Sequence, residues 1–288
     1  MKNYVIFTDS CADLTKEMYG ALELRCIPLD VIVENEEPVA DDKIDIKEIY
    51  AKLRAKQSAS TAAINIDRFL QCFEDAAKEG LDVLYLCFSS GLSSTYSSSV
   101  VAMRELQEKY PENKFYAVDT LCASMGQGLL VYYAANMKKA GASIEEVRDF
   151  VENTKLNLCH WFTVDDLFFL KRGGRVSAAT AVVGSLLNIK PVLHVDNAGK
   201  LINVSKARGR KASIDTMFEN MKKSMFPVEQ NQTVFISHGD CIADAEYLAN
   251  RIKTEMGIED VRINYVGSVI GSHSGPGTLA LFFLGNER

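Results

Sequence analysis

The stretch LYLCFSSGLSSTYSSSVVAM, residues 84–103, decides the fold prediction. Its beginning, 84–88, is a continuous apolar run, which is typical of a strand buried on both faces of a sheet. A small, hydroxyl-rich loop follows over 89–94. From Thr95 onward, apolar residues recur every three or four positions, as they do along one face of a helix. The stretch therefore predicts a buried strand, a polar loop and a helix in direct succession.

The polar loop lies where the predicted helix begins, and this position favours a negatively charged ligand. The first N–H groups of a helix have no partner within the helix, and the helix dipole adds partial positive charge there. Residues 83–103 include no Lys, Arg, Asp or Glu, so this stretch supplies no formal counter-charge. We therefore expect neutral hydroxyl groups to surround an acidic head group.

Strand-like runs and helical patterns alternate from the start of the chain to about residue 158. This alternation is typical of a doubly wound α/β domain with a parallel sheet, in which ligands lie beyond the carboxyl ends of the strands. We expect one strand over 27–33 and a small polar loop over 57–65. The loops predicted at the ligand-binding edge are 8–10, 58–65, 89–94 and 120–124.

After about residue 158 the pattern changes to that of an α+β domain. Residues 190–207 predict an antiparallel hairpin with a turn at 197–199. We expect a small-residue helix over 177–187 and an apolar helix over 279–284, both as walls of a tunnel between the domains. The predicted domains are an N-terminal α/β domain, 1–158, and a C-terminal α+β domain, 159–288, with the ligand between them.

Composition excludes several classes of protein. The net charge of −6 argues against nucleic-acid binding, which needs a basic surface. Two long uncharged stretches, 83–103 and 263–286, have Ser, Gly or Pro at their centres, so we expect no membrane span. The seven cysteines are scattered without a C-x-x-C pair, which indicates reduced thiols in the cytoplasm. The four histidines are isolated and no G-x-G-x-x-G pattern occurs, so we expect neither a metal nor another cofactor.

Seven short motifs occur in a recognisable order along essentially the whole chain. They are FTDSCADL, Thr61 followed by Phe69, SSGLSSTY, DTLCASMGQG, LKRGGRVS, NIKPVLHVDNAGK and IGSHSGPG. In this combination the chain closely resembles the DegV family, the fatty-acid-binding proteins of bacteria.

The resemblance implies two α/β domains that hold a long-chain fatty acid between them, and no catalytic residues. By motif position, its carboxylate would be bound by Thr61, Ser93 and His273, and we add Asn65 and Ser94 as candidate ligand-binding residues. The chain departs from the family pattern at 62–65, where a second hydroxyl-bearing position is lost, and at Ser94, where the family has Gly. The resemblance also implies a partner, a fatty acid kinase that would phosphorylate the bound acid with ATP.

These residue types suit a carboxylate with an apolar tail. A buried carboxylate has about four lone-pair sites, which two hydroxyls, an imidazole N–H and backbone amides can satisfy. Each such charge-assisted bond contributes roughly 1.5–3 kcal/mol. A tail of roughly 15 methylenes contributes up to about 12 kcal/mol before ordering costs. The tail therefore supplies most of the affinity, and the head group sets the orientation.

The main alternative function is that of a serine hydrolase acting on acyl esters. Ser93 would be its nucleophile, His273 its base, and Asp9 or Asp119 the acid that orients the base. The nucleophile-elbow pattern G-x-S-x-G is incomplete here, because Thr95 stands at its last position.

Some of these positions also fit purely structural roles. Thr61 is a candidate helix N-cap, and His273 a hydrogen-bonded core imidazole. Two basic clusters remain open: Lys171, Arg172 and Arg175 fit either charge at a helix C-terminus or a basic rim at the pocket mouth. The second cluster, Arg208, Arg210 and Lys211, fits a solvated face or a contact with a partner.

Overall fold

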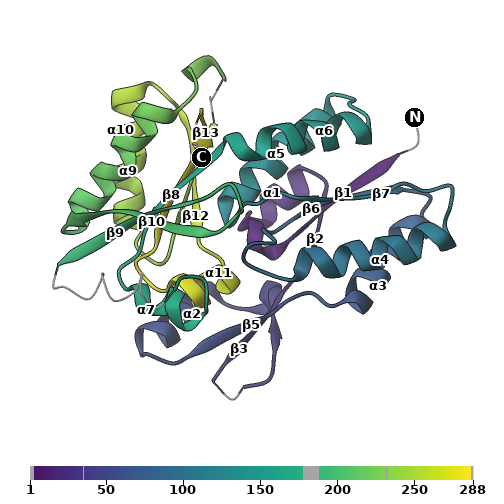
Figure 1. Cartoon of the computed structure of the whole chain (residues 1–288), viewed down its shortest axis with the longest axis horizontal. Helices are drawn as coiled ribbons and strands as arrows, with labels where there is room; N and C mark the ends of the chain where they lie inside the picture. Colours follow the sequence, from purple (N-terminus) through teal and green to yellow (C-terminus); the bar gives the residue numbers. More distant parts are fainter. Residues whose placement is uncertain (1–2, 35, 178–187, 231–232, 287) are drawn as a thin grey trace.

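A computed structural model describes residues 3–34, 36–177, 188–230, 233–286 and 288 (Figure 1). The first half of the chain forms a parallel sheet in the order β2–β1–β6–β7. Helices cover both of its faces, α3 and α4 on one and α5 and α6 on the other. The predicted doubly wound domain is confirmed. Its elements are β1 (Tyr4–Asp9), α1 (Lys16–Ala21), β2 (Leu24–Ile27), α3 (Ile66–Lys78), β6 (Asp82–Cys87), α4 (Thr95–Lys109), β7 (Phe115–Asp119), α5 (Met125–Lys139) and α6 (Ile144–Thr154).

The second half forms a mixed sheet in the order β10–β9–β8–β13–β11–β12. Helices α9 and α10 pack on one face of this sheet, and α5 packs on the other (Figure 1). The predicted hairpin is confirmed as β9 and β10. The elements are β8 (Leu158–Thr163), α7 (Leu167–Arg172), β9 (Ile189–Val195), β10 (Leu201–Arg208), α9 (Arg210–Ser224), β11 (Thr233–His238), α10 (Ile242–Met256), β12 (Asp260–Tyr265), α11 (Ser268–Ser274) and β13 (Leu279–Leu284).

A small antiparallel sheet, in the order β4–β3–β5, lies below the parallel sheet in Figure 1. Helix α11, from the end of the chain, packs against β5 and α7. The elements of this region are β3 (Asp30–Val33), β4 (Val39–Ala40), α2 (Ile46–Arg54) and β5 (Ala59–Ala62). Short 3-10 turns complete the described chain: η1 (Ser10–Ala12), η2 (Asp41–Lys43), η3 (Lys155–Asn157) and η4 (Val228–Gln230).

Three sequence predictions about these elements are wrong. The single strand expected over 27–33 is two strands of different sheets, because Pro28 separates them and has no N–H for a ladder. The loop expected over 57–65 contains β5, which pairs with β3 and carries Thr61. The apolar helix expected over 279–284 is the strand β13, which lies between β8 and β11.

The error at 279–284 has a simple physical reason. All residues of β13 are buried, so their run shows neither a helical nor a strand periodicity. The short length of the run was the better indicator of a strand. The helix expected over 177–187 falls almost wholly outside the described residues, and the boundary after residue 158 stays a prediction. Among the helices in the described ranges, none has both the length and the apolar character needed to cross a bilayer.

Asp9 joins two central strands of the parallel sheet at their carboxyl ends. Its buried carboxylate accepts hydrogen bonds from the Tyr85 hydroxyl at 2.7 Å and from the backbone N–H groups of Phe88 at 2.9 Å and Cys11 at 3.1 Å. Burial raises the pKa of Asp9, and these hydrogen bonds act in the opposite direction. The carboxylate therefore fixes the backbone immediately before the hydroxyl-rich loop.

We predict that Asp9→Ala lowers the free energy of unfolding by about 2–4 kcal/mol, because a buried hydroxyl and two buried amides lose their acceptor. Urea denaturation followed by circular dichroism measures the change. Asp42→Ala, at an exposed position, is the matched control and should cost less than about 0.5 kcal/mol. Equal losses in the two variants would contradict this role of Asp9.

Candidate functional site

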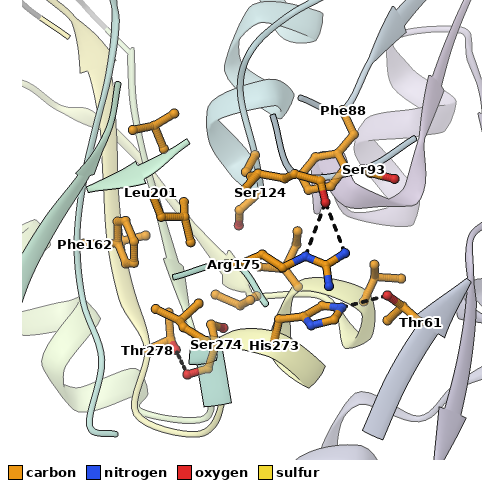
Figure 2. Close-up of a pocket in the computed structure, with 18 of the residues that line it drawn as sticks. Thr61, Phe88, Ser93, Ser124, Phe162, Arg175, Leu201, His273, Ser274 and Thr278 are labelled. Atoms are coloured by element: carbon orange, nitrogen blue, oxygen red, sulfur yellow. Dashed lines mark hydrogen bonds between the residues drawn. The ribbon is translucent and has the colours of Figure 1, made fainter. Parts of the chain in front are cut away.

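A cavity of about 280 Å³ lies at the carboxyl edge of the parallel sheet, where it meets the second sheet and α11 (Figure 2). Most of its lining is apolar, with a smaller number of polar side chains. The polar side chains of the lining include Thr61, Ser93, Ser94, Arg175 and His273. The main apolar residues are Phe88, Phe162, Leu170, Leu201, Val269 and Phe282.

Thr61 and His273 meet across 212 positions of sequence. The Thr61 Oγ1 and His273 Nε2 atoms are 2.7 Å apart, a hydrogen bond in which either atom can be the donor, depending on the tautomer (Figure 2). Pairing of β5 with β3 positions Thr61 opposite Val31, and packing of α11 against β5 brings His273 to it. The sheet that sequence reasoning missed is therefore the element that presents Thr61.

The imidazole of His273 is packed against the end of α7. Its Nδ1 atom faces Gly173 so closely that a Cβ atom at that position would collide with it. Burial lowers the pKa of His273 to about 4, and the positive charges of Arg175 and Arg172 add to the effect. At neutral pH the imidazole is therefore uncharged, and it contributes hydrogen bonds to the cavity rather than charge.

Arg175 brings a positive charge to the wall of this cavity. Its guanidinium donates to the Leu92 carbonyl from Nε at 3.3 Å and from Nη2 at 3.1 Å (Figure 2). It also donates to the Gly173 carbonyl from Nη1. Burial lowers the pKa of Arg175. This residue supplies the counter-charge that the stretch 83–103 lacks, and it was not in the predicted ligand-binding set.

The signal for Arg175 was present in the LKRGGRVS segment. Gly173 ends α7, and Gly174 has a positive φ of 72°, so the chain reverses there and returns Arg175 toward the loop after β6. The sequence left two roles open for this basic cluster, charge at a helix C-terminus or a basic rim at the pocket. For Arg175 the geometry favours the pocket. Arg172 instead lies over the ring of Phe169, with its guanidinium carbon 5.0 Å from the ring centre.

Ser93 and Ser94 both line the cavity from the loop before α4. The Ser93 hydroxyl is 2.9 Å from Thr95 Oγ1 and accepts from the Thr95 N–H at 3.2 Å. Ser94 is the N-cap residue of α4 but makes no side-chain capping bond. The loop therefore starts α4 and also faces the cavity. A structural role at the helix start is thus compatible with a role in ligand binding.

Asn65 is not brought to the cavity. It is exposed and is the N-cap of α3, where its side chain accepts from the Arg68 N–H at 2.9 Å. The side chain thus satisfies a helix-end amide, the ordinary use of Asn at such a position. We therefore do not include Asn65 among the proposed ligand-binding residues.

The hydrolase alternative is not supported by this geometry. Ser93 is hydrogen-bonded to Thr95, whereas His273 Nε2 contacts Thr61. Within the described part of the chain, His273 Nδ1 has no hydrogen-bond partner, so no carboxylate orients the ring.

The two aspartates that the alternative requires have other partners. Asp9 belongs to the strand-end network described above. Asp119 accepts from the backbone N–H groups of Ser90 and Leu121, each at 3.1 Å. Within the described ranges, His, Cys, Asp and Glu side chains also form no cluster of three or more that could hold a metal ion.

The apolar wall includes a histidine that behaves as a neutral aromatic residue. His160 Nδ1 is 3.0 Å from the Leu158 carbonyl, and its Nε2 accepts from the Ala123 N–H at 3.3 Å. Burial holds the pKa of His160 well below its usual range. Its ring meets that of Phe282 edge to face, with 5.3 Å between centres. Phe282 lies on β13, so residues 279–284 do contribute to the wall, as a strand.

The hairpin of β9 and β10 closes this region against the hydroxyl-rich loop. The Ser89 hydroxyl donates to the Gly199 carbonyl at 2.8 Å. Gly91 approaches the Ala198 and Gly199 carbonyls so closely that a Cβ atom would collide with backbone. The small residues of the loop therefore allow the turn of the hairpin to pack directly on it.

Comparisons with known proteins agree with this architecture. The model of the family described as "Uncharacterised protein, DegV family" matches residues 3–286. A DegV domain-containing protein of Clostridium perfringens is 49% identical over 290 residues, covering 100% of this chain and 99% of the relative. A DegV domain-containing protein of Streptococcus pyogenes is 36% identical, covering 99% of each chain.

Two solved structures are also similar. One, titled as fatty acid binding of a DegV family protein from Thermus thermophilus, has a TM-score of 0.87 at 29% identity and covers 99% of this chain and 100% of that one. Another, titled as DegV, a fatty acid binding protein from Bacillus subtilis, has a TM-score of 0.85 at 28% identity with the same coverage. By its sequence match over nearly its whole length and by its fold, the chain belongs to the DegV family.

Proposed function

We propose that this protein binds a long-chain fatty acid in the cavity between its two sheets. The carboxylate contacts Thr61, Ser93 and His273 and faces Arg175, and the tail follows the apolar wall. The observation that carries the proposal is the Thr61–His273 contact of 2.7 Å beside a half-buried guanidinium, in a cavity whose other walls are mostly apolar. The Thermus and Bacillus relatives, whose titles name fatty acid binding, support it.

The head-group end suits a carboxylate better than a neutral group. Thr61, Ser93 and the neutral His273 offer hydrogen bonds, and Arg175 offers the positive charge. A carboxylate that enters the cavity loses its hydration, which is tolerable only when its lone pairs find donors and its charge a partner. The hydroxyl-only environment expected from residues 83–103 is thus replaced by hydroxyls plus one guanidinium.

The rest of the wall suits a hydrocarbon tail. Phe88, Phe162, Leu201 and Phe282 line it together with other apolar side chains. Burial of a tail against them gives a favourable transfer free energy of about 0.8 kcal/mol per methylene. The tail therefore supplies most of the affinity, while the polar end fixes which way the acid enters.

We further propose that this chain presents the acid and that a separate fatty acid kinase phosphorylates it with ATP, in the cytoplasm. A carboxylate is an acceptor for a phosphoryl group, and nothing in the described cavity resembles an activated serine with its base and acid. As expected of thiols in a reducing compartment, no disulfide is formed by Cys11, Cys26, Cys72, Cys87, Cys122 or Cys241. Neutral Ser93 and His273 would hold the carboxylate without reacting with it.

We predict that protein purified from cells carries a non-covalent long-chain fatty acid. Organic extraction followed by mass spectrometry detects it, and native mass spectrometry gives the number of acids per chain. A ratio near one supports the proposal. Repeated recovery of no acyl lipid, together with no uptake of added fatty acid, would overturn it.

Ser93→Ala, His273→Ala and Arg175→Gln should each weaken retention of the acid by about tenfold or more, because each removes a bond to a charged group. Lipid content per chain and the thermal unfolding midpoint are measured together. Ser97→Ala, an exposed serine on the same helix as Thr95, is the matched control and should retain the acid. Lowered midpoints with unchanged lipid content would assign these residues a structural role instead.

The isolated chain should neither turn over acyl esters nor form a covalent adduct at Ser93 with a serine-reactive probe. The acyl phosphate should appear only when a separate fatty acid kinase and ATP are added, since phosphoryl transfer needs the nucleotide. Thin-layer chromatography of labelled acid follows the product. Stoichiometric labelling of Ser93, or ester turnover that is lost in Ser93→Ala, would favour the hydrolase.

A further inference from the structure

Four buried hydroxyl groups lie in or just after α11, and three of them have acceptors within the chain. Ser268 donates to the Asp41 carboxylate. Ser272 donates to the Ser268 carbonyl at 2.7 Å, one helical turn earlier. Thr278 donates to the carbonyls of Ser274 at 3.0 Å and Gly275 at 2.8 Å. Such local bonds are the ordinary way in which Ser and Thr are buried in helices and turns.

Ser274 is the exception. Only 4% of its surface is exposed, and among the described residues its hydroxyl has no hydrogen-bond partner. Buried hydroxyls in native proteins usually have a partner, because an unpaired one has lost its water without compensation. Since Ser274 also lines the cavity, a bound ligand is a natural source of the missing partner.

The position of Ser274 separates it from the carboxylate end. Figure 2 shows it beside Thr278, on the opposite side of His273 from Thr61. Phe162, Ala280 and Phe282 line the same cavity, so the Ser274 hydroxyl is one of a few polar groups in a mostly apolar lining. Both His273 and Ser274 line the cavity, so in the proposed binding mode Ser274 lies near the head-group end of the tail.

We infer that the cavity prefers a hydroxy fatty acid, with the hydroxyl on the part of the tail next to the carboxylate. This inference rests on the proposed binding of a fatty acid. A hydroxyl on the ligand can donate to Ser274 Oγ or accept from it, which satisfies both groups at once. A plain methylene at that point leaves Ser274 unpaired, and sites built to bond a ligand hydroxyl discriminate against analogues that lack it.

A competition experiment tests this preference with the full chain. Purified protein is equilibrated with equal concentrations of hexadecanoate and 3-hydroxyhexadecanoate, and the bound acids are extracted and quantified by mass spectrometry. The hydroxy acid should be enriched about fivefold, as expected for one additional neutral hydrogen bond. In Ser274→Ala the ratio should fall to one or below, because the ligand hydroxyl then has no partner.

Ser272→Ala is the matched control: it removes a hydroxyl of the same helix that bonds only to backbone and does not line the cavity. It should keep the fivefold ratio. Equal binding of the two acids by the unmodified protein, or a ratio that survives in Ser274→Ala, would overturn the inference. Equal loss of both acids in Ser274→Ala would also overturn it, by making Ser274 a ligand of the carboxylate. Failure of every form to bind either acid would instead refute the proposed function.

Discussion

The hydrogen bond between Thr61 and His273 is the contact on which the candidate site depends. It joins the small antiparallel sheet, whose strands belong to the first part of the sequence, to α11, which lies near the C-terminus. Both side chains line the cavity, so the same contact closes this part of the wall and presents two hydrogen-bonding groups to a ligand. Gly173 supports it by leaving room for the imidazole, and the Arg175 guanidinium sits beside it.

The electrostatics of this cavity follow from burial. A neutral His273, with its pKa lowered to about 4, avoids placing a second positive charge next to Arg175. An entering carboxylate then meets one guanidinium and several neutral donors, so its charge is matched without an excess. The buried His273 Nδ1 and Ser274 Oγ atoms lack partners among the described residues, and a buried polar atom without a partner has an energetic cost. A ligand that bonds Ser274 would offset part of that cost.

Local sequence patterns were sufficient for much of the fold. Strands that end in small polar loops and lead into amphipathic helices predicted the parallel sheet, and the Asn197–Gly199 turn predicted the hairpin. These patterns gave wrong predictions where pairing between strands that are distant in sequence determines the structure. The run 279–284 is apolar throughout because it crosses the middle of a sheet, and the strand at Thr61 exists through its pairing with β3.

The candidate site was less accessible to such patterns. The separation of Thr61 and His273 in the sequence gives no indication that they are close in space. Only the family resemblance predicts that they belong to one site. Arg175 was recognised as part of a basic cluster, but its contact with the Leu92 carbonyl depends on how the chain turns after Gly174. Asn65 is close to Thr61 in sequence, but it directly precedes α3. Its side chain therefore caps that helix instead of lining the cavity.

A crystal structure of the protein with hexadecanoic acid tests the central claim most directly. The account predicts one acid in the cavity between the sheets, with carboxylate oxygens in hydrogen-bond distance of Thr61 Oγ1 and the His273 imidazole and facing Arg175. The tail should pass between Phe162 and Phe282. A carboxylate bound elsewhere, or a tail that occupies the polar end, would contradict it.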